Sequence, residues 1–172
     1  NKAEIIVCSQ NFHGRTSTII SFSSDAGSKT NFGPHAQGFI TIPYNDIEAL
    51  ESILETHPHI AGFLVEPIQG EAGVYTPDVD FMSKANALCM EYNVLLMADE
   101  IQTGIGRTGS LLAVCGNCSC KGHCEQQKET YTRPDVLILG KAISGGTMTS
   151  NDDIAFIQHT NGFLAQALEP FA

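Results

Sequence analysis

The chain has 172 residues, of which 42% are hydrophobic and 16% charged, so it is long enough to form one domain with a buried core. Its formal net charge of −10 argues against nucleic acid as a partner, because contact with phosphates favours a basic surface. No apolar stretch reaches membrane-spanning length, and no signal peptide precedes the first apolar run. Since the chain begins at Asn1 without an initiator methionine, we expect it to be a piece of a longer protein.

The first third of the chain contains short predicted strands separated by polar segments. The apolar runs 3–8, 38–44 and 60–65 predict strands. Segment 13–21 has the start of a helical pattern, but its β-branched residues oppose a helix. The Ser-, Gly- and Asp-rich segment 22–38 predicts a loop.

Two helices are predicted between the later strands. Asn45 and Glu48 have the spacing of a capping box, which predicts a helix with Asn45 as its N-cap and an end near His57. A second helix is predicted to begin at 77–78 and to end before Asn93, a residue that suits a left-handed cap. Its apolar face consists of Phe81, Ala85, Leu88 and Tyr92.

Two further apolar runs end in charged residues. Segment 94–98 precedes Asp99 and a glycine-rich loop, and segment 136–139 precedes Lys141 in a turn of small residues. Alternating strands and helices predict an α/β fold with a mostly parallel sheet, whose strand ends share one ligand-binding edge. A desolvated lysine there forms an imine with a carbonyl, and a carboxylate keeps a pyridine nitrogen protonated. The alternative for Lys141 is a lysine at a strand end whose amine reaches water. The alternative for Asp99 is a solvated acid in a loop.

Residues 1–146, apart from one insertion, carry seven motifs in a fixed order. The motifs are Asn11–Thr16, Gly33–Pro34, Ile42–Asp46, Val65–Gly73, Ala98–Gly104, Arg107–Gly109 and Leu139–Gly146. Together they resemble the class-III aminotransferases, which use pyridoxal 5'-phosphate (PLP) and have fold type I. The resemblance implies an α/β fold with a mostly parallel sheet and helices on both of its faces. This sheet would be part of the large domain of a fold-type-I PLP-dependent transferase.

The resemblance also implies how the cofactor is held. Lys141 would bind PLP covalently and move a proton during the reaction, and Asp99 would pair with the pyridine nitrogen. Gln102 would hydrogen-bond the phenolic oxygen, while Phe12 and Ile101 would lie on the two faces of the ring. The plain alternative for Phe12 is core packing, and that for Gln102 is an exposed loop position.

Three residues are candidates for substrate binding. Arg15 would bind a substrate carboxylate, Glu66 has a strand-end position, and Glu71 would be a switch that pairs with an arginine of the small domain. A surface ion pair for Arg15 and a solvated loop charge for Glu71 are the alternatives. Within the family, Gly33–Pro34, Ile42–Asp46 and Glu71 favour the ornithine-using members over those that use acetylornithine or 4-aminobutyrate.

The implied reaction moves the δ-amino group of ornithine to 2-oxoglutarate, giving glutamate semialdehyde and glutamate, a step of amino-acid metabolism and proline biosynthesis. The partners are then small amino acids and 2-oxo acids, with neither nucleic acid nor membrane. A homodimer or higher oligomer in the cytoplasm or the mitochondrial matrix is implied. A non-catalytic fragment or truncated paralogue is the rival hypothesis, and the chain alone is expected to be inactive.

The chain departs from the family pattern in two segments, so we divide it into a partial PLP-binding large domain, 1–146, and a divergent segment, 147–172. The family's glycine-serine turn for the cofactor phosphate and the small domain with its arginine are also not found in this sequence. The first departure is a Cys-rich insertion at 115–133. A surface hairpin with reduced thiols, a disulfide or redox pair, and a zinc site are the three hypotheses for it. The zinc ligands would come from Cys115, Cys118, Cys120 and Cys124, with His123 nearby. Cys8 and Cys89, in contrast, are predicted to be buried.

Overall fold

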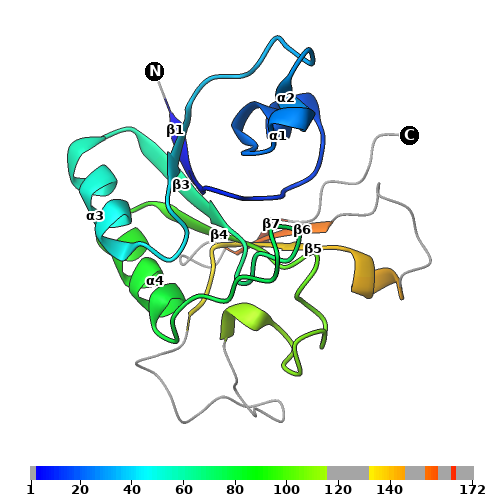
Figure 1. Cartoon of the computed structure of the whole chain (residues 1–172). Coiled ribbons are helices and arrows are strands. Elements are labelled where there is room, and N and C mark those ends of the chain that lie inside the picture. The colour runs from blue at the N-terminus through cyan, green and yellow to red at the C-terminus, as the bar shows by residue number, and fades with distance from the viewer. Residues whose placement is uncertain (1–2, 116–131, 146–153, 159–163, 166–172) are drawn as a thin grey trace.

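A computed structural model describes residues 3–115, 132–145, 154–158 and 164–165, which form one seven-stranded sheet with flanking helices (Figure 1). The sheet order is β2-β1-β3-β4-β5-β6-β7. Neighbouring strands from β2 to β5 are parallel, whereas β6 pairs antiparallel with β5 and β7 antiparallel with β6. The strands are β1 Glu4–Cys8, β2 Phe39–Ile42, β3 Ile60–Val65, β4 Leu95–Asp99, β5 Val136–Leu139, β6 Ile154–Gln158 and β7 Leu164–Ala165. The mostly parallel α/β sheet is thereby confirmed.

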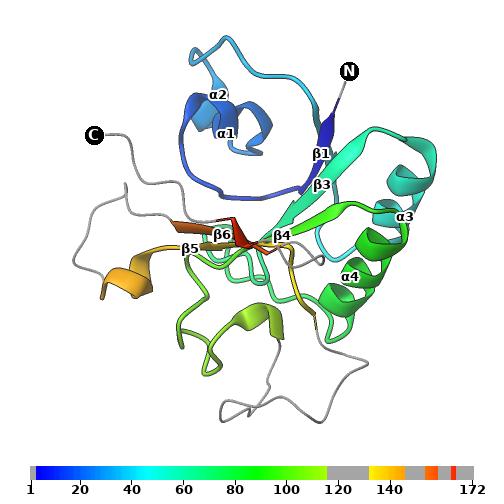
Figure 2. The same cartoon turned by 180° about the vertical axis from the view of Figure 1, so that it is seen from behind.

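Helices cover both faces of the parallel part of the sheet, as predicted (Figures 1 and 2). Residues of α3 and α4 pack on one face, and residues of α1 pack on the other. The helices are α1 Ser17–Phe22, α2 Ala26–Lys29, α3 Ile47–Thr56 and α4 Phe81–Glu91, and the 3-10 helices are η1 Ala113–Cys115 and η2 Lys141–Ser144.

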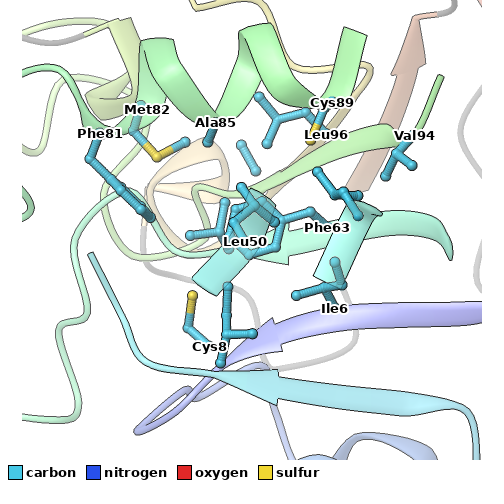
Figure 3. Close-up of a cluster of buried hydrophobic side chains, with 14 of the residues drawn as sticks. Ile6, Cys8, Leu50, Phe63, Phe81, Met82, Ala85, Cys89, Val94 and Leu96 are labelled. Atoms are coloured by element: carbon cyan, nitrogen blue, oxygen red, sulfur yellow. The ribbon is translucent and has the colours of Figure 1, made fainter. Parts of the chain in front are cut away.

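Successive strand residues face opposite sides of the sheet, and this alternation builds two apolar clusters. On β1, Ile6 and Cys8 belong to the larger cluster with α3 and α4, while Val7 belongs to the smaller cluster with α1. On β3, Phe63 faces the larger cluster and Leu64 the smaller one. Figure 3 shows side chains of the larger cluster between the strands and α4. The predicted burial of Cys8 and Cys89 is confirmed, since each is 1% exposed.

The connections reverse direction at β1, which lies between β2 and β3 in the sheet. The chain leaves β1 for β2 through α1 on one face, then returns past β1 to β3 through α3 on the opposite face. The second connection runs across the sheet in the opposite direction from the first and also covers the opposite face. Both crossovers therefore have the same handedness. Such a reversal opens a crevice at the carboxyl ends of the two strands beside it, here β1 and β3, and ligands of α/β sheets bind in this place.

The predicted capping box is wrong in its choice of cap. The N-cap of α3 is Asp46, whose side chain accepts a hydrogen bond of 2.9 Å from the backbone N–H of Ala49. Asn45 instead has a left-handed backbone, with φ of 64°, and its side-chain oxygen accepts a hydrogen bond from the N–H of Asp78. The other end of the helix agrees with the prediction, because His57 is its C-cap.

Other element boundaries differ by a few residues from their predictions. Helix α4 begins at Phe81 rather than at 77–78, and it ends before Asn93, whose φ of 54° is the predicted left-handed conformation. Segment 13–21 does enter a helix, at Ser17, with Thr16 as the N-cap. The predicted loop 22–38 contains one helical turn, α2. Within the described residues, no helix is both long and apolar enough to cross a bilayer.

Candidate active site

The predicted site residues lie at the carboxyl ends of four adjacent parallel strands. Phe12 follows β1, Glu66 follows β3, Asp99 ends β4, and Lys141 follows β5. In the β4–β5 register Asp99 is opposite Ile138, three residues before Lys141. Segments that are far apart in the sequence are thus brought to one edge, which includes the reversal point of the connections beside β1.

Asp99 is a buried carboxylate with both oxygens hydrogen-bonded. Its side chain is 6% exposed, and Oδ2 lies 2.6 Å from Nδ1 of His13. Oδ1 accepts a hydrogen bond of 3.1 Å from the N–H of Ile101. The two contacts fix the plane of the carboxylate, so Asp99 is held in place rather than being the solvated loop acid of the alternative hypothesis.

His13 is a site residue that the sequence prediction missed. Its side chain is 2% exposed, and its ring centroid lies 6.0 Å from that of Phe22, in the smaller apolar cluster. Among the described residues, Nε2 is buried and has no hydrogen-bond partner. A proton on Nδ1 satisfies this geometry, because the ring then donates a hydrogen bond to Oδ2 of Asp99.

Glu66 is a second buried carboxyl group at this edge. It is 7% exposed, and Oε2 accepts a hydrogen bond of 3.0 Å from the N–H of Phe12. Burial raises the pKa of Glu66 to about 7, and the negative charges of Asp99 and Glu71 act in the same direction, whereas His13 and the Phe12 N–H oppose it. Near neutral pH the group therefore exchanges a proton readily, which favours a role inside the site over one as a surface charge.

Phe12 and Ile101, the predicted neighbours of the cofactor ring, lie half-buried on the loops that follow β1 and β4. The guanidinium carbon of Arg15 lies 5.7 Å from the centroid of the Phe12 ring, a cation–π distance. Arg15 is exposed. Its fork of N–H donors is therefore accessible next to the ring that is predicted to stack on the cofactor.

The loops after β3 and β4 touch at Gly70 and Gln102. A Cβ atom built on Gly70 would lie 2.8 Å from Cδ of Gln102, so the end of the Gln102 side chain lies directly against Gly70 and would have to move if Gly70 carried a side chain. Gln102 and Glu71 are both exposed. The contact places the two predicted polar residues, Gln102 and Glu71, on adjoining loops of the same edge.

Lys141 is exposed, and this corrects the expectation that its amine is desolvated. Burial along β5 continues through Leu139 and Gly140 and ends there. Lys141 already belongs to the turn that follows, with a left-handed φ of 47° at the start of η2. The lysine is thus at the predicted edge, but in this structure its solvation is that of a surface side chain.

The cysteine hypotheses fall largely on residues that the structure does not describe. Of the four candidate ligands, Cys118, Cys120 and Cys124 lie outside the described ranges, and Cys115 is half-buried at the end of η1. Among the residues that are described, no group of three or more His, Cys, Asp or Glu side chains is placed to hold a metal ion. The three hypotheses for the insertion remain predictions.

The residues at this edge fit the ring of PLP. Asp99 is a buried, oriented carboxylate of the kind that a pyridine N–H requires, and Phe12 provides an aromatic face on a neighbouring loop. Lys141 supplies an amine on the adjacent strand end. The predicted roles of Phe12, Asp99, Ile101, Gln102 and Lys141 are compatible with this arrangement and remain predictions about binding.

Comparison with known proteins agrees with the fold and with the family that the motifs resemble. The family model Aminotransferase class-III matches residues 1–161. An ornithine aminotransferase of Plasmodium falciparum (isolate 3D7) is 45% identical over 162 residues, which is 91% of this chain and 36% of that protein. One of Bacillus anthracis (strain A0248) is 48% identical over 146 residues, 85% of this chain and 33% of that protein.

Solved structures lead to the same family. An ornithine aminotransferase from Toxoplasma gondii, described with partial occupancy of PLP at its active site, superposes with a TM-score of 0.79 at 40% identity, over 94% of this chain and 34% of that one. An acetylornithine aminotransferase from Elizabethkingia anophelis superposes with a TM-score of 0.64 at 41% identity, over 93% and 31%. The chain spans about a third of the length of the relatives it matches.

Proposed function

The chain belongs to the class-III aminotransferase family, whose members depend on PLP, and on this premise we propose that it carries the ring-binding part of an ornithine aminotransferase active site. The proposed reaction moves the δ-amino group of ornithine to 2-oxoglutarate, giving glutamate semialdehyde and glutamate. The observation that carries the proposal is the Asp99 carboxylate, buried and held by His13, on the strand next to the Lys141 turn. The names of the relatives support the choice of ornithine.

Each residue has one task in this proposal. When bound, PLP supplies a pyridinium ring that accepts electron density from the substrate carbon. Asp99 holds the proton on the ring nitrogen, and His13 keeps the carboxylate in the required plane. Lys141 Nζ holds the cofactor and carries the proton to and from the substrate carbon. Its exposure means that it acts as this base only after cofactor and substrate have displaced water.

The remaining site residues restrict the ring and bind the substrate. Phe12 and Ile101 limit the tilt of the ring, and Gln102 donates a hydrogen bond to its phenolic oxygen. Arg15 binds a substrate carboxylate through its planar fork. Glu71 adds a negative charge near this edge, and Glu66 adds a second one when it is ionised, which suits a diamino acid whose second amine is cationic.

The rival substrates are acetylornithine and 4-aminobutyrate, and the acetylornithine aminotransferase among the structural relatives supports the first. A non-catalytic paralogue is the rival from another class. The proposal further includes a homodimer or higher oligomer that works inside the cell, in the cytoplasm or the mitochondrial matrix. Size-exclusion chromatography with light scattering tests the oligomeric state, and fractionation of cells tests the compartment.

The decisive experiment uses the product of the complete coding sequence. With PLP and 2-oxoglutarate, ornithine should give glutamate semialdehyde faster than acetylornithine or 4-aminobutyrate reacts. Borohydride reduction should leave a pyridoxyl label on the peptide that contains Lys141. We expect Lys141→Ala to abolish the label and to lower the rate by several orders of magnitude, because attachment and proton transfer are lost together.

Lys84→Ala is the matched control, because Lys84 is an exposed lysine of α4 that pairs with the N-cap residue Asp80 and belongs to none of the seven motifs. It should keep both the label and the rate. A label on Lys84 or Lys128, or an unlabelled but fully active protein, would contradict the assignment of Lys141.

A further inference from the structure

Glu100 is a buried carboxylate to which the proposed reaction gives no task. It is 1% exposed, although it directly follows Asp99 at the end of β4. One oxygen accepts a hydrogen bond of 2.7 Å from the N–H of Val114, and the other accepts the hydroxyl of Thr103. Burial raises the pKa of Glu100, and the hydrogen bonds from Thr103 and Val114 oppose that rise. An ionised carboxylate only accepts hydrogen bonds, so a buried one is stable where several donors converge on it, as they do here.

The backbone of Glu100 is tied to the neighbouring strand. Its N–H donates to the carbonyl of Ile138 on β5 at 2.9 Å, and its carbonyl accepts from the N–H of Gly104 at 2.8 Å. A Cβ atom on Gly104 would lie 2.8 Å from that carbonyl oxygen and 3.0 Å from Cδ2 of Leu139. The turn at Thr103–Gly104 is therefore pressed against the end of β5, with no space for a side chain.

These contacts link three parts of the site edge. Asp99 precedes Glu100 in the chain, Gly104 packs on Leu139, and Leu139 is two residues before Lys141. Residues 101–112 contain no helix or strand, so the side chain of Glu100 joins the two ends of this long connection, at Thr103 and at η1.

We propose that Glu100 is a positioning residue, which holds loop 101–115 against β5 and thereby sets the position of the Lys141 turn relative to Asp99. The importance of that position for catalysis rests on the proposed function, whereas the structural coupling does not. Substitution by glutamine keeps the size of the side chain but replaces one acceptor oxygen with an NH₂ donor. That NH₂ group can donate to the Thr103 oxygen while the amide oxygen accepts the N–H of Val114, but the Thr103 hydroxyl then loses its buried carboxylate acceptor, and the bond from Val114 is no longer charge-assisted.

Amide hydrogen exchange on the chain without PLP tests the coupling directly. In Glu100→Gln we expect exchange to be about tenfold faster or more at Gly104 and Val114, and also at Ile143 and Gly145, the two amides that donate hydrogen bonds within the Lys141 turn. Amides of α3, which do not contact this region, should exchange as in the unsubstituted chain.

The matched control is Asp135→Asn, since Asp135 is a carboxylate between the same two strands at their opposite ends. Its Oδ2 accepts a hydrogen bond of 2.9 Å from the N–H of Leu96, and an asparagine oxygen can still accept this single bond. Asp135→Asn should leave the hydrogen-exchange rates of the Ile143 and Gly145 amides unchanged. If Glu100→Gln prevents folding, Thr103→Val, which removes one donor, should give the same pattern with smaller changes.

Exchange that is unchanged in Glu100→Gln, or faster in loop 101–115 alone, would overturn the proposal, because the loop would then not be coupled to the Lys141 turn. In the product of the complete coding sequence, borohydride trapping of PLP on Lys141 should be lower for Glu100→Gln than for Asp135→Asn, and equal trapping would also count against the coupling. If the unsubstituted protein traps no PLP, the proposed function fails, and the exchange result still decides the role of Glu100.

Discussion

The hydrogen bond between His13 and Asp99 joins residues that are 86 positions apart, and it gives Asp99 a fixed orientation at the strand edge. The sequence predicted Asp99 because a charged residue follows a run of apolar ones, which is a local signal. His13 carries no such signal, since its role depends on a contact with a distant strand. Its position in the motif Asn11–Thr16 was the sole hint, and the neighbouring Phe12 and Arg15 received the roles instead.

The charge of Asp99 leads to a prediction for catalysis. Asp99→Asn should fold normally, because the amide has the same shape and its oxygen can accept the N–H of Ile101. The turnover of ornithine should fall roughly 100-fold or more, since a neutral partner does not hold the proton on the ring nitrogen. Steady-state kinetics together with thermal unfolding measures both effects. Near-normal kcat would contradict the role, and Asp135→Asn controls for the change from acid to amide.

Glu66 leads to a prediction for stability. Its folded-state pKa of about 7 is above the ordinary value of 4.5, so the native state binds the proton more tightly than the unfolded state does. This contribution is fully present below pH 4.5 and is lost as pH rises to about 7. The stability of the unsubstituted chain relative to Glu66→Gln should therefore fall by roughly 3 kcal/mol over this interval and then stay level.

Urea unfolding of both chains at several pH values measures this difference. A difference that rises with pH, or that does not change, would show that Glu66 is not held as a neutral acid.

At the scale of elements, helix α3 shows where local sequence patterns stop being sufficient. Asn45 and Asp46 are adjacent residues, and each is a good N-cap. The choice between them depends on Asn45, which takes a left-handed conformation and binds the N–H of Asp78, 33 residues along the chain. The parallel strands β1 to β5, in contrast, were predicted closely, because their apolar runs reflect burial in the sheet, whereas β6 and β7 were not predicted. The exposure of Lys141 was not predicted, since it depends on the exact residue at which β5 ends.

The correct cap can be tested by substitution. Asp46→Ala should lower the free energy of unfolding by about 1 kcal/mol, because the N–H of Ala49 loses its acceptor, while Asp46→Asn should stay close to the unsubstituted chain. Glu48→Ala serves as the control, since removal of the side chain would matter little outside a capping box. A larger loss for Glu48→Ala than for Asp46→Ala would restore the capping box with Asn45.

At the scale of the whole molecule, the sheet unites the ring-binding residues, but the chain spans about a third of the length of its relatives. We therefore expect the 172-residue polypeptide alone to bind PLP weakly and to show no measurable transamination of ornithine. The family's phosphate-binding turn and the arginine that would pair with Glu71 were not identified in its sequence. Absorbance titration with PLP and an assay for glutamate semialdehyde decide the point. Robust, PLP-dependent activity would show that these residues complete a site by themselves.

The strand ends that form this edge also determine when it can form during folding. Phe12 binds Glu66 across 54 positions and His13 binds Asp99 across 86, so neither contact can be made by a nearby segment of the chain. Closing such long loops costs entropy before any contact compensates for it, and parallel pairing adds further delay. A fluorescent probe next to Asp99 should therefore report folding later than a probe in α3, and the order of the two signals would show whether the ligand-binding edge is the last part of the sheet to be assembled.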